Sequence, residues 1–237
     1  MTTMKRQSGF TLVEIAIVLV IVGLLLGGIL KGQELINSAR VRNLADQNAA
    51  VQAAYYGFID RYRQIPGDWP AAAATTGIGV TVVSPTSANA GNGRIDDGDW
   101  DEASGVWEQL AGAGFIAGNY SGGGTAANYT DGTRAPVNAF NGSVLLGRMD
   151  QYQDNGTAVE RLAFSFGNQI PAKILRELDV KLDDGRPLTG ILRVSGTATG
   201  GWATMFTSVA ACTTGTAPNI EWDVATDSQD CGAVSLY

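Results

Sequence analysis

The stretch "SGFTLVEIAIVLVIVGLLLGG" occupies residues 8–28 and decides how the rest of the chain is read. Between residues 10 and 30 the only charged side chain is that of Glu14. A run of about 20 apolar residues is long enough to cross the hydrocarbon core of a membrane as a helix. Because a carboxylate in that environment costs roughly 2.5 to 3.5 kcal/mol, the stretch must contain or attract something that offsets the cost.

Two ordinary kinds of apolar N-terminus fit this stretch only in part. A secretory signal has an apolar core of about 7 to 15 residues followed by a cleavage site with small residues, whereas here the run continues into the helix-like "KGQELINSAR" of residues 31–40. A plain membrane anchor explains the length but gives no reason for Glu14. Lys5 and Arg6 precede the run, which predicts a cytoplasmic N-terminus with the bulk of the chain on the other side.

The segment "KRQSGFTLVE", residues 5–14, resembles the N-terminal signal of type IV pilins and type II secretion pseudopilins. In that signal a short basic leader ends in glycine and is followed by an aromatic residue, an acid and an apolar helix. The resemblance implies that a prepilin peptidase cuts between Gly9 and Phe10 and that the new amino group of Phe10 is methylated. It also implies that this amino group pairs with Glu14 of a neighbouring subunit, since two opposite charges in lipid cost much less together than apart.

The resemblance divides the chain into a leader at residues 1–9, a membrane and filament-core helix at residues 10–30, and a stem plus globular head at residues 31–237. The implied partners are copies of the chain itself, other pilins, the prepilin peptidase and the inner membrane. The implied location is the inner membrane with a periplasmic head, and then an extracellular pilus or a periplasmic pseudopilus.

The apolar helix is expected to continue to residue 64 as an amphipathic helix. Apolar residues at spacings of three and four form one stripe, with Asn48 in the remaining position. The helix should end at "QIPGDWP", where Pro66, Gly67 and Pro70 cannot continue it. The members of the stripe are Val41, Leu44, Asn48, Val51, Tyr55, Phe58 and Tyr62.

The remainder is expected to form a head built around an antiparallel sheet. Residues 71–92 suggest loop or weak strand, residues 101–115 a short helix, and residues 170–179 a third helix that has Pro171 in its first turn. Strand-like runs follow the helix of residues 101–115, at residues 142–149, 159–166, 188–194, 202–209 and 219–224. We therefore predict an α+β, pilin-like fold in which one long helix packs on the sheet.

Two cysteines, Cys212 and Cys231, are the only ones in the chain. Their position beyond a membrane segment favours one disulfide in an oxidising compartment over two free buried thiols. The predicted fold thus includes a C-terminal disulfide loop.

The segment "NGRIDDGDWDE", residues 92–102, is a candidate for calcium binding. Its pattern resembles the second half of an EF-hand-type loop, although Ala88 and Ala90 stand where the first half would supply oxygen ligands. The alternative is a solvated acidic turn that caps the next helix. The candidate Ca²⁺ ligands are Asn92, Asp96, Asp97, Asp99 and Asp101.

Charge and composition narrow the function classes. Residues 64–237 hold nine basic and nineteen acidic residues, a net charge of −10, which argues against nucleic acid as a partner and leaves divalent cations open. Histidine is absent from the chain, no G-x-S-x-G motif occurs, and no two acids are set apart as acid and base, so we expect no enzymatic activity.

The expected function is that of a structural subunit of a type IV pilus or a pilus-like filament. Two alternatives stay open: a type II secretion pseudopilin, and a minor or tip pilin whose head binds a surface or a secreted substrate.

Overall fold

The computed structural model describes residues 11–196, 201–205, 212–216, 219–226 and 228–237, and it divides the chain into two units, Met1–Arg40 and Val41–Tyr237. The helix α1 (Leu12–Tyr62) contributes to both units. The predicted long helix over residues 10–64 is therefore confirmed within the described residues.

In the first unit, α1 is apolar on every face. Each residue from Thr11 to Lys31 is exposed, and this helix is long and apolar enough to cross a membrane. A helix that is hydrophobic all round is stable only inside lipid or against other helices.

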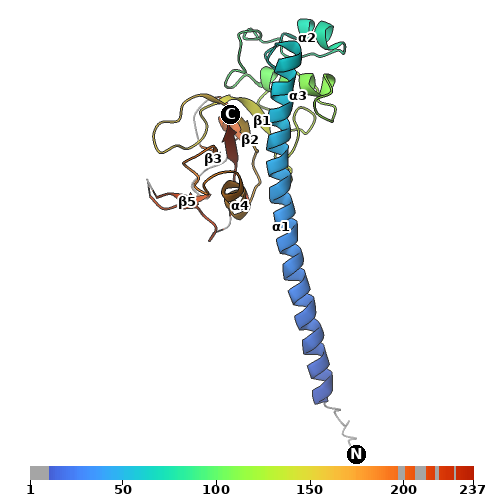
Figure 1. The fold of residues 1–237 in the computed structure, drawn as a ribbon, viewed down its shortest axis with the longest axis vertical. Helices are drawn as coiled ribbons and strands as arrows, with labels where there is room; N and C mark the ends of the chain where they lie inside the picture. The colour runs from blue at the N-terminus through green and yellow to red at the C-terminus, as the bar shows by residue number, and fades with distance from the viewer. Residues whose placement is uncertain (1–10, 197–200, 206–211, 217–218, 227) are drawn as a thin grey trace, which may run out of the picture. The chain divides into compact units, whose positions relative to one another are not determined.

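In the second unit, α1 buries one stripe of side chains. Val41, Leu44, Asn48, Val51, Tyr55 and Phe58 are buried, as predicted, together with Ala54, and the predicted Tyr62 is partly buried. The ring of Phe58 packs against Tyr62, Trp69 and Phe115, with centroids 4.7 to 6.1 Å apart. These contacts join the end of α1 to the segments around the helix α3 (Trp100–Gly112) (Figure 1).

The head contains a four-stranded antiparallel sheet in the order β1-β2-β6-β3. A two-stranded sheet, β4-β5, lies near the disulfide between Cys212 and Cys231, whose Cα atoms are 5.7 Å apart. The strands are β1 (Leu145–Met149), β2 (Arg161–Ser165), β3 (Leu192–Val194), β4 (Thr213–Thr214), β5 (Glu221–Trp222) and β6 (Ala233–Leu236). The described helices besides α1 are α2 (Ala71–Ile78), α3 (Trp100–Gly112), α4 (Ala172–Leu182) and the short 3₁₀ turn η1 (Ala203–Met205).

This architecture confirms the predicted α+β class, the antiparallel sheet head and the C-terminal disulfide. Four of the predicted strand runs contain a strand, although β3 and β5 occupy only part of theirs. Helices α3 and α4 lie within two or three residues of their expected bounds, and Pro171 is the N-cap residue of α4 rather than a member of its first turn.

Two local predictions are wrong, and two strands, β4 and β6, lie outside every predicted strand run. Residues 71–78 form the helix α2 instead of loop or strand, because four alanines have high helix propensity and Pro70 is suited to precede a first turn. Residues 203–205 form η1 instead of strand, and residues 206–209 of that predicted run lie outside the described residues. The strand β6 was not predicted at all, although it lies between β2 and β3.

Asn48 connects α1 to the C-terminal strand. Its side chain, 9% exposed, donates from Nδ2 to Ser235 Oγ at 3.2 Å and accepts from the Tyr237 hydroxyl at 2.9 Å. The hydrogen-bonding groups of the Asn48 side chain are thus satisfied by Ser235 in β6 and by Tyr237.

We expect Asn48→Leu to destabilise the head by about 1–3 kcal/mol, because Ser235 would lose a buried hydrogen bond and the Tyr237 hydroxyl would keep only its longer bond to the backbone carbonyl of residue 48. Urea unfolding of the full chain in detergent, followed by tryptophan fluorescence, measures this loss. Asn43→Leu makes the same chemical change at an exposed position of α1 and should leave the midpoint near the wild-type value. Equal stability of the Asn48 and Asn43 variants would contradict the role of Asn48.

Candidate functional site

The predicted processing residues Gly9 and Phe10 lie outside the described residues, and Thr11 is the first residue whose structure is known. Cleavage between Gly9 and Phe10, and the pairing of Phe10 with Glu14, therefore stay predictions. The structure does show what surrounds Glu14.

Glu14 and Thr11 form a capping box at the start of α1. Glu14 Oε2 accepts hydrogen bonds from the Thr11 backbone N–H at 2.8 Å and from the Thr11 hydroxyl at 2.9 Å. In return, the Glu14 backbone N–H donates to Thr11 Oγ1 at 3.3 Å. This exchange satisfies donors that a helix start leaves without partners, so the carboxylate has a local function that the sequence analysis did not consider.

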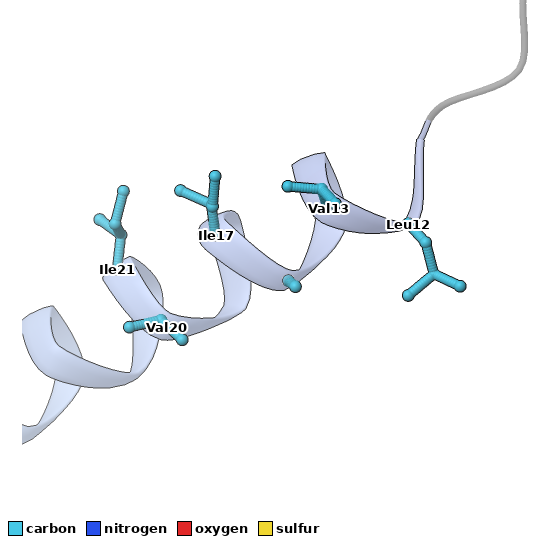
Figure 2. A pocket seen from close by; sticks show the side chains of 6 residues that line it. Leu12, Val13, Ile17, Val20 and Ile21 are labelled. Atoms are coloured by element: carbon cyan, nitrogen blue, oxygen red, sulfur yellow. The ribbon is translucent and has the colours of Figure 1, made fainter.

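An apolar groove begins at Leu12, between the two residues of the capping box. It has a volume of about 350 Å³ and is lined by Leu12, Val13, Ala16, Ile17, Val20 and Ile21. Figure 2 shows the side chains of Val13, Ile17 and Ile21 following one another along one side of the helix. An exposed apolar surface of this kind marks contact with lipid or with another protein.

Four glycines lie further along the same helix, toward its middle. A Cβ atom added at Gly23, Gly27, Gly28 or Gly32 would meet no other atom within 4 Å. Small residues at four-residue spacing allow close approach of a second helix in lipid. Gly23 and Gly27 lie on one side of α1 and Gly28 and Gly32 on roughly the opposite side, so the described contacts leave two small-residue faces available to neighbours.

In the head, the candidate calcium ligands are held by different partners. Asn92 Nδ2 donates to Asp96 Oδ2 at 2.5 Å, and Asp96 also pairs with Arg94. Asp99 is the N-cap of α3, since its Oδ1 accepts from the Asp101 and Glu102 backbone N–H groups at 3.1 and 3.2 Å. The capping function proposed as the alternative is thus confirmed for Asp99.

The other two candidates bind other segments. Asp101 accepts backbone N–H bonds from Thr86 and Ser87 at 2.6 and 3.1 Å, and Asp97 accepts from Gln151 Nε2 at 2.8 Å. Asp97, Asp99 and Asp101 line one open pocket of about 460 Å³, whereas Asn92 and Asp96 do not. Calcium binding by all five residues stays a prediction.

Burial raises the pKa of two acids within this segment. Glu102 is fully buried, and burial raises its pKa to about 8; the hydrogen bond from the Asp96 backbone N–H at 2.6 Å acts in the opposite direction. Burial also raises the pKa of Asp97, and the nearby carboxylates of Asp150 and Glu160 add to the rise. Gln151, which touches Asp97, was missed by sequence reasoning because 54 residues separate the two.

A second group of acids lies in the last turn of α4 and directly after it. Among the described residues, Asp179, Asp183 and Asp184 are the acids whose carboxylate oxygens lie within 4.8 Å of one another as a group. Each already accepts hydrogen bonds: Asp179 from Trp222 Nε1 at 2.7 Å, Asp183 from the Leu192 backbone N–H at 3.2 Å, and Asp184 from the Arg186 backbone N–H at 2.9 Å.

The three acids therefore have a structural function. Asp179 is fully buried, and burial raises its pKa to about 6. Asp179 ties α4 itself to β5, and Asp183 ties the turn after α4 to β3.

Comparison with protein families matches residues 4–30 to the family described as the prokaryotic N-terminal methylation motif. Comparison with curated proteins and with solved structures gave no match. The matched residues include Gly9, Phe10 and Glu14 and end where the apolar run ends, so the match concerns the N-terminal signal and leaves the head aside. The chain thus carries a prepilin-type signal followed by a long apolar helix, and it fits a type IV pilin-like protein.

Proposed function

We propose that this chain is a structural subunit of a type IV pilus or a pilus-like filament, without enzymatic activity. In this proposal a prepilin peptidase cuts between Gly9 and Phe10, and the N-terminal helix then carries the subunit from the inner membrane into the filament. The observation that supports it most directly is the methylation motif at residues 4–30 fused to a helix whose apolar side chains are exposed on every face.

The apolar surface of α1 provides the driving contacts. Before assembly it is covered by lipid, and in a filament it would be covered by the same helix of neighbouring subunits. Helices in lipid associate through close packing and polar contacts rather than through the hydrophobic effect. The groove of residues 12–21 and the two open glycine pairs, Gly23/Gly27 and Gly28/Gly32, suit such packing.

Glu14 supplies the polar contact. The capping box gives its carboxylate two donors from Thr11, but both are neutral and leave the negative charge in place. The amino group freed at Phe10 of a neighbouring subunit would neutralise that charge and fix the position of one helix along the next.

The location follows from the same features. Lys5 and Arg6 favour a cytoplasmic N-terminus, and the disulfide between Cys212 and Cys231 suits an oxidising compartment for the head. A type II secretion pseudopilin and a minor or tip pilin share the processing step and differ in where the mature subunit assembles. The partners proposed in every case are the peptidase, other pilins and further copies of this chain.

We expect processing to be visible in the mass of the mature chain. Intact-mass spectrometry of the protein purified from membranes should show a chain that begins at Phe10 and carries one added methyl group. Gly9→Val should retain residues 1–9, whereas Ser8→Ala should be processed normally. A mature chain that still contains Met1, or one that begins beyond residue 30, would contradict the proposed function.

Two variants separate the charge of Glu14 from its capping function. Glu14→Gln keeps an oxygen that can accept from Thr11 but removes the charge, so we expect the filament fraction to fall about tenfold or more. Thr11→Val removes the capping hydroxyl and keeps the charge, so it should cost about 1 kcal/mol of helix stability and change the filament yield little.

The yield is measured as the ratio of mature subunit in the sheared filament fraction to that in the membrane fraction. Both variants should insert in the membrane and lose residues 1–9 as the wild type does. If Thr11→Val lowers the ratio as much as Glu14→Gln, helix capping rather than charge pairing is what assembly requires.

A further inference from the structure

We infer that Asn155 is the acceptor of an N-linked glycan on the head. The inference rests on the export of the head, which the proposed function includes, and adds a covalent modification to it. The triplet Asn-x-Ser/Thr, with any residue except proline in the middle, is the acceptor sequence for this modification in secreted proteins. Four such triplets occur in the chain, and they begin at Asn119, Asn128, Asn141 and Asn155.

Of these four triplets, the one that begins at Asn155 is the one in which all three residues are exposed. It lies in the connection of residues 150–160 between the paired strands β1 and β2, outside any helix or strand. Among the described residues, the side chains of Asn155 and Thr157 have no hydrogen-bond partner. The amide that would accept the sugar and the hydroxyl that the acceptor sequence requires are therefore both accessible to an enzyme.

The connection is held at both ends and is open between them. Near its start, Asp154 pairs with Arg193 at 3.2 Å. Near its end, the Tyr152 hydroxyl donates to the Val159 carbonyl at 2.8 Å. A sugar on the Asn155 amide would extend from the open part into solvent and would displace none of the contacts that hold the ends.

The triplet at Asn128 is folded into a tight turn. Asn128 Oδ1 accepts from the Thr125 backbone N–H at 2.7 Å, and the Tyr129 N–H donates to the Thr125 carbonyl at 3.0 Å. The Tyr129 side chain is fully buried, and its hydroxyl accepts from Trp107 Nε1 at 2.8 Å. An enzyme could bind this triplet only by pulling an aromatic residue out of the core of the head.

The triplets at Asn141 and Asn119 are each held in part. Asn141 is exposed, but Ser143, which would supply the hydroxyl, is 6% exposed and lies in a β-bridge. In the triplet at Asn119 the first and last residues are exposed, whereas Tyr120 packs against the core. Exposure of the complete triplet therefore distinguishes Asn155 from the other three asparagines.

The transfer forms one bond and breaks another. The donor class is an oligosaccharide linked through a pyrophosphate to a membrane lipid, and an oligosaccharide transferase is the catalyst. Asn155 Nδ2 forms a bond to the anomeric carbon of the sugar and loses one proton. The bond between that carbon and the pyrophosphate oxygen breaks, and the lipid pyrophosphate leaves with the electron pair. Because the donor lies in the membrane, the transfer suits the stage at which α1, long and apolar enough to cross a membrane, still anchors the chain.

The test is peptide mass spectrometry of the full chain purified from membranes of the organism that makes it. Trypsin cuts after lysine and arginine, and the peptides that contain the four triplets are residues 95–134 with Asn119 and Asn128, residues 135–148 with Asn141, and residues 149–161 with Asn155. We expect the peptide of residues 149–161 to gain the mass of one glycan in most chains. The other two peptides should have the masses of their sequences.

Variants of the triplet identify the kind of modification. Asn155→Gln and Thr157→Val should each abolish the added mass, because one removes the acceptor amide and the other removes the required hydroxyl. Thr157→Ser keeps a hydroxyl and should retain the glycan. Both positions are exposed, so all three variants should fold. Asn119→Gln makes the same change at another exposed asparagine and should leave the mass of residues 149–161 as in the wild type.

Three results would overturn the inference. One is an unmodified peptide of residues 149–161 from a chain that begins at Phe10. Another is an added mass that persists in Thr157→Val, since that modification would not depend on the hydroxyl. The third is a glycan on residues 95–134 or 135–148 and none on residues 149–161, which would show that exposure in the folded head does not select the acceptor. A chain that carries the glycan at Asn155 but retains residues 1–9 would support this inference and contradict the proposed function alone.

Discussion

The rest of the structure depends on a single helix that meets two different environments. From Leu12 to Leu30 every face of α1 is apolar and exposed, whereas from Val41 to Phe58 one stripe is buried and the other faces carry polar side chains. The buried stripe packs against the head of the same chain. The fully apolar half has no such partner among the described residues, and only lipid or other helices can cover it.

This difference gives Glu14 its importance. A capping box does not require a charge, because glutamine in the same position can accept the same hydrogen bonds. An acid in that position, at the edge of an apolar helix, keeps a charge that Thr11 does not neutralise. The cost of that charge would be offset by contact with a cation, and the processing implied by the prepilin-type signal would create one, the amino group of a new N-terminus.

The parts of the fold that periodicity describes could be predicted from the sequence. The stripe of α1 repeats over several turns, and two cysteines leave only one intramolecular pairing. The strand β6 could not be recognised in this way, because Ala233, Val234 and Ser235 are all buried and show no alternation of polar and apolar residues. Likewise, Asp97 and Gln151 meet only through the fold, so no local pattern relates them.

The net charge of the head does not reveal what its acidic side chains do. A net charge of −10 over residues 64–237 suggests a solvated acidic surface, yet many of these carboxylates are used to hold loops. Asp68 accepts backbone N–H bonds from Gly91, Asn92 and Gly93, and Glu108 accepts them from Val83 and Ser84.

Such contacts are needed because the strands of this head are short and long connections run between them. Backbone donors in those connections have no sheet to pair with, and a carboxylate can accept two or three of them at once. Many of the acidic residues of the head therefore serve to hold its loops in place.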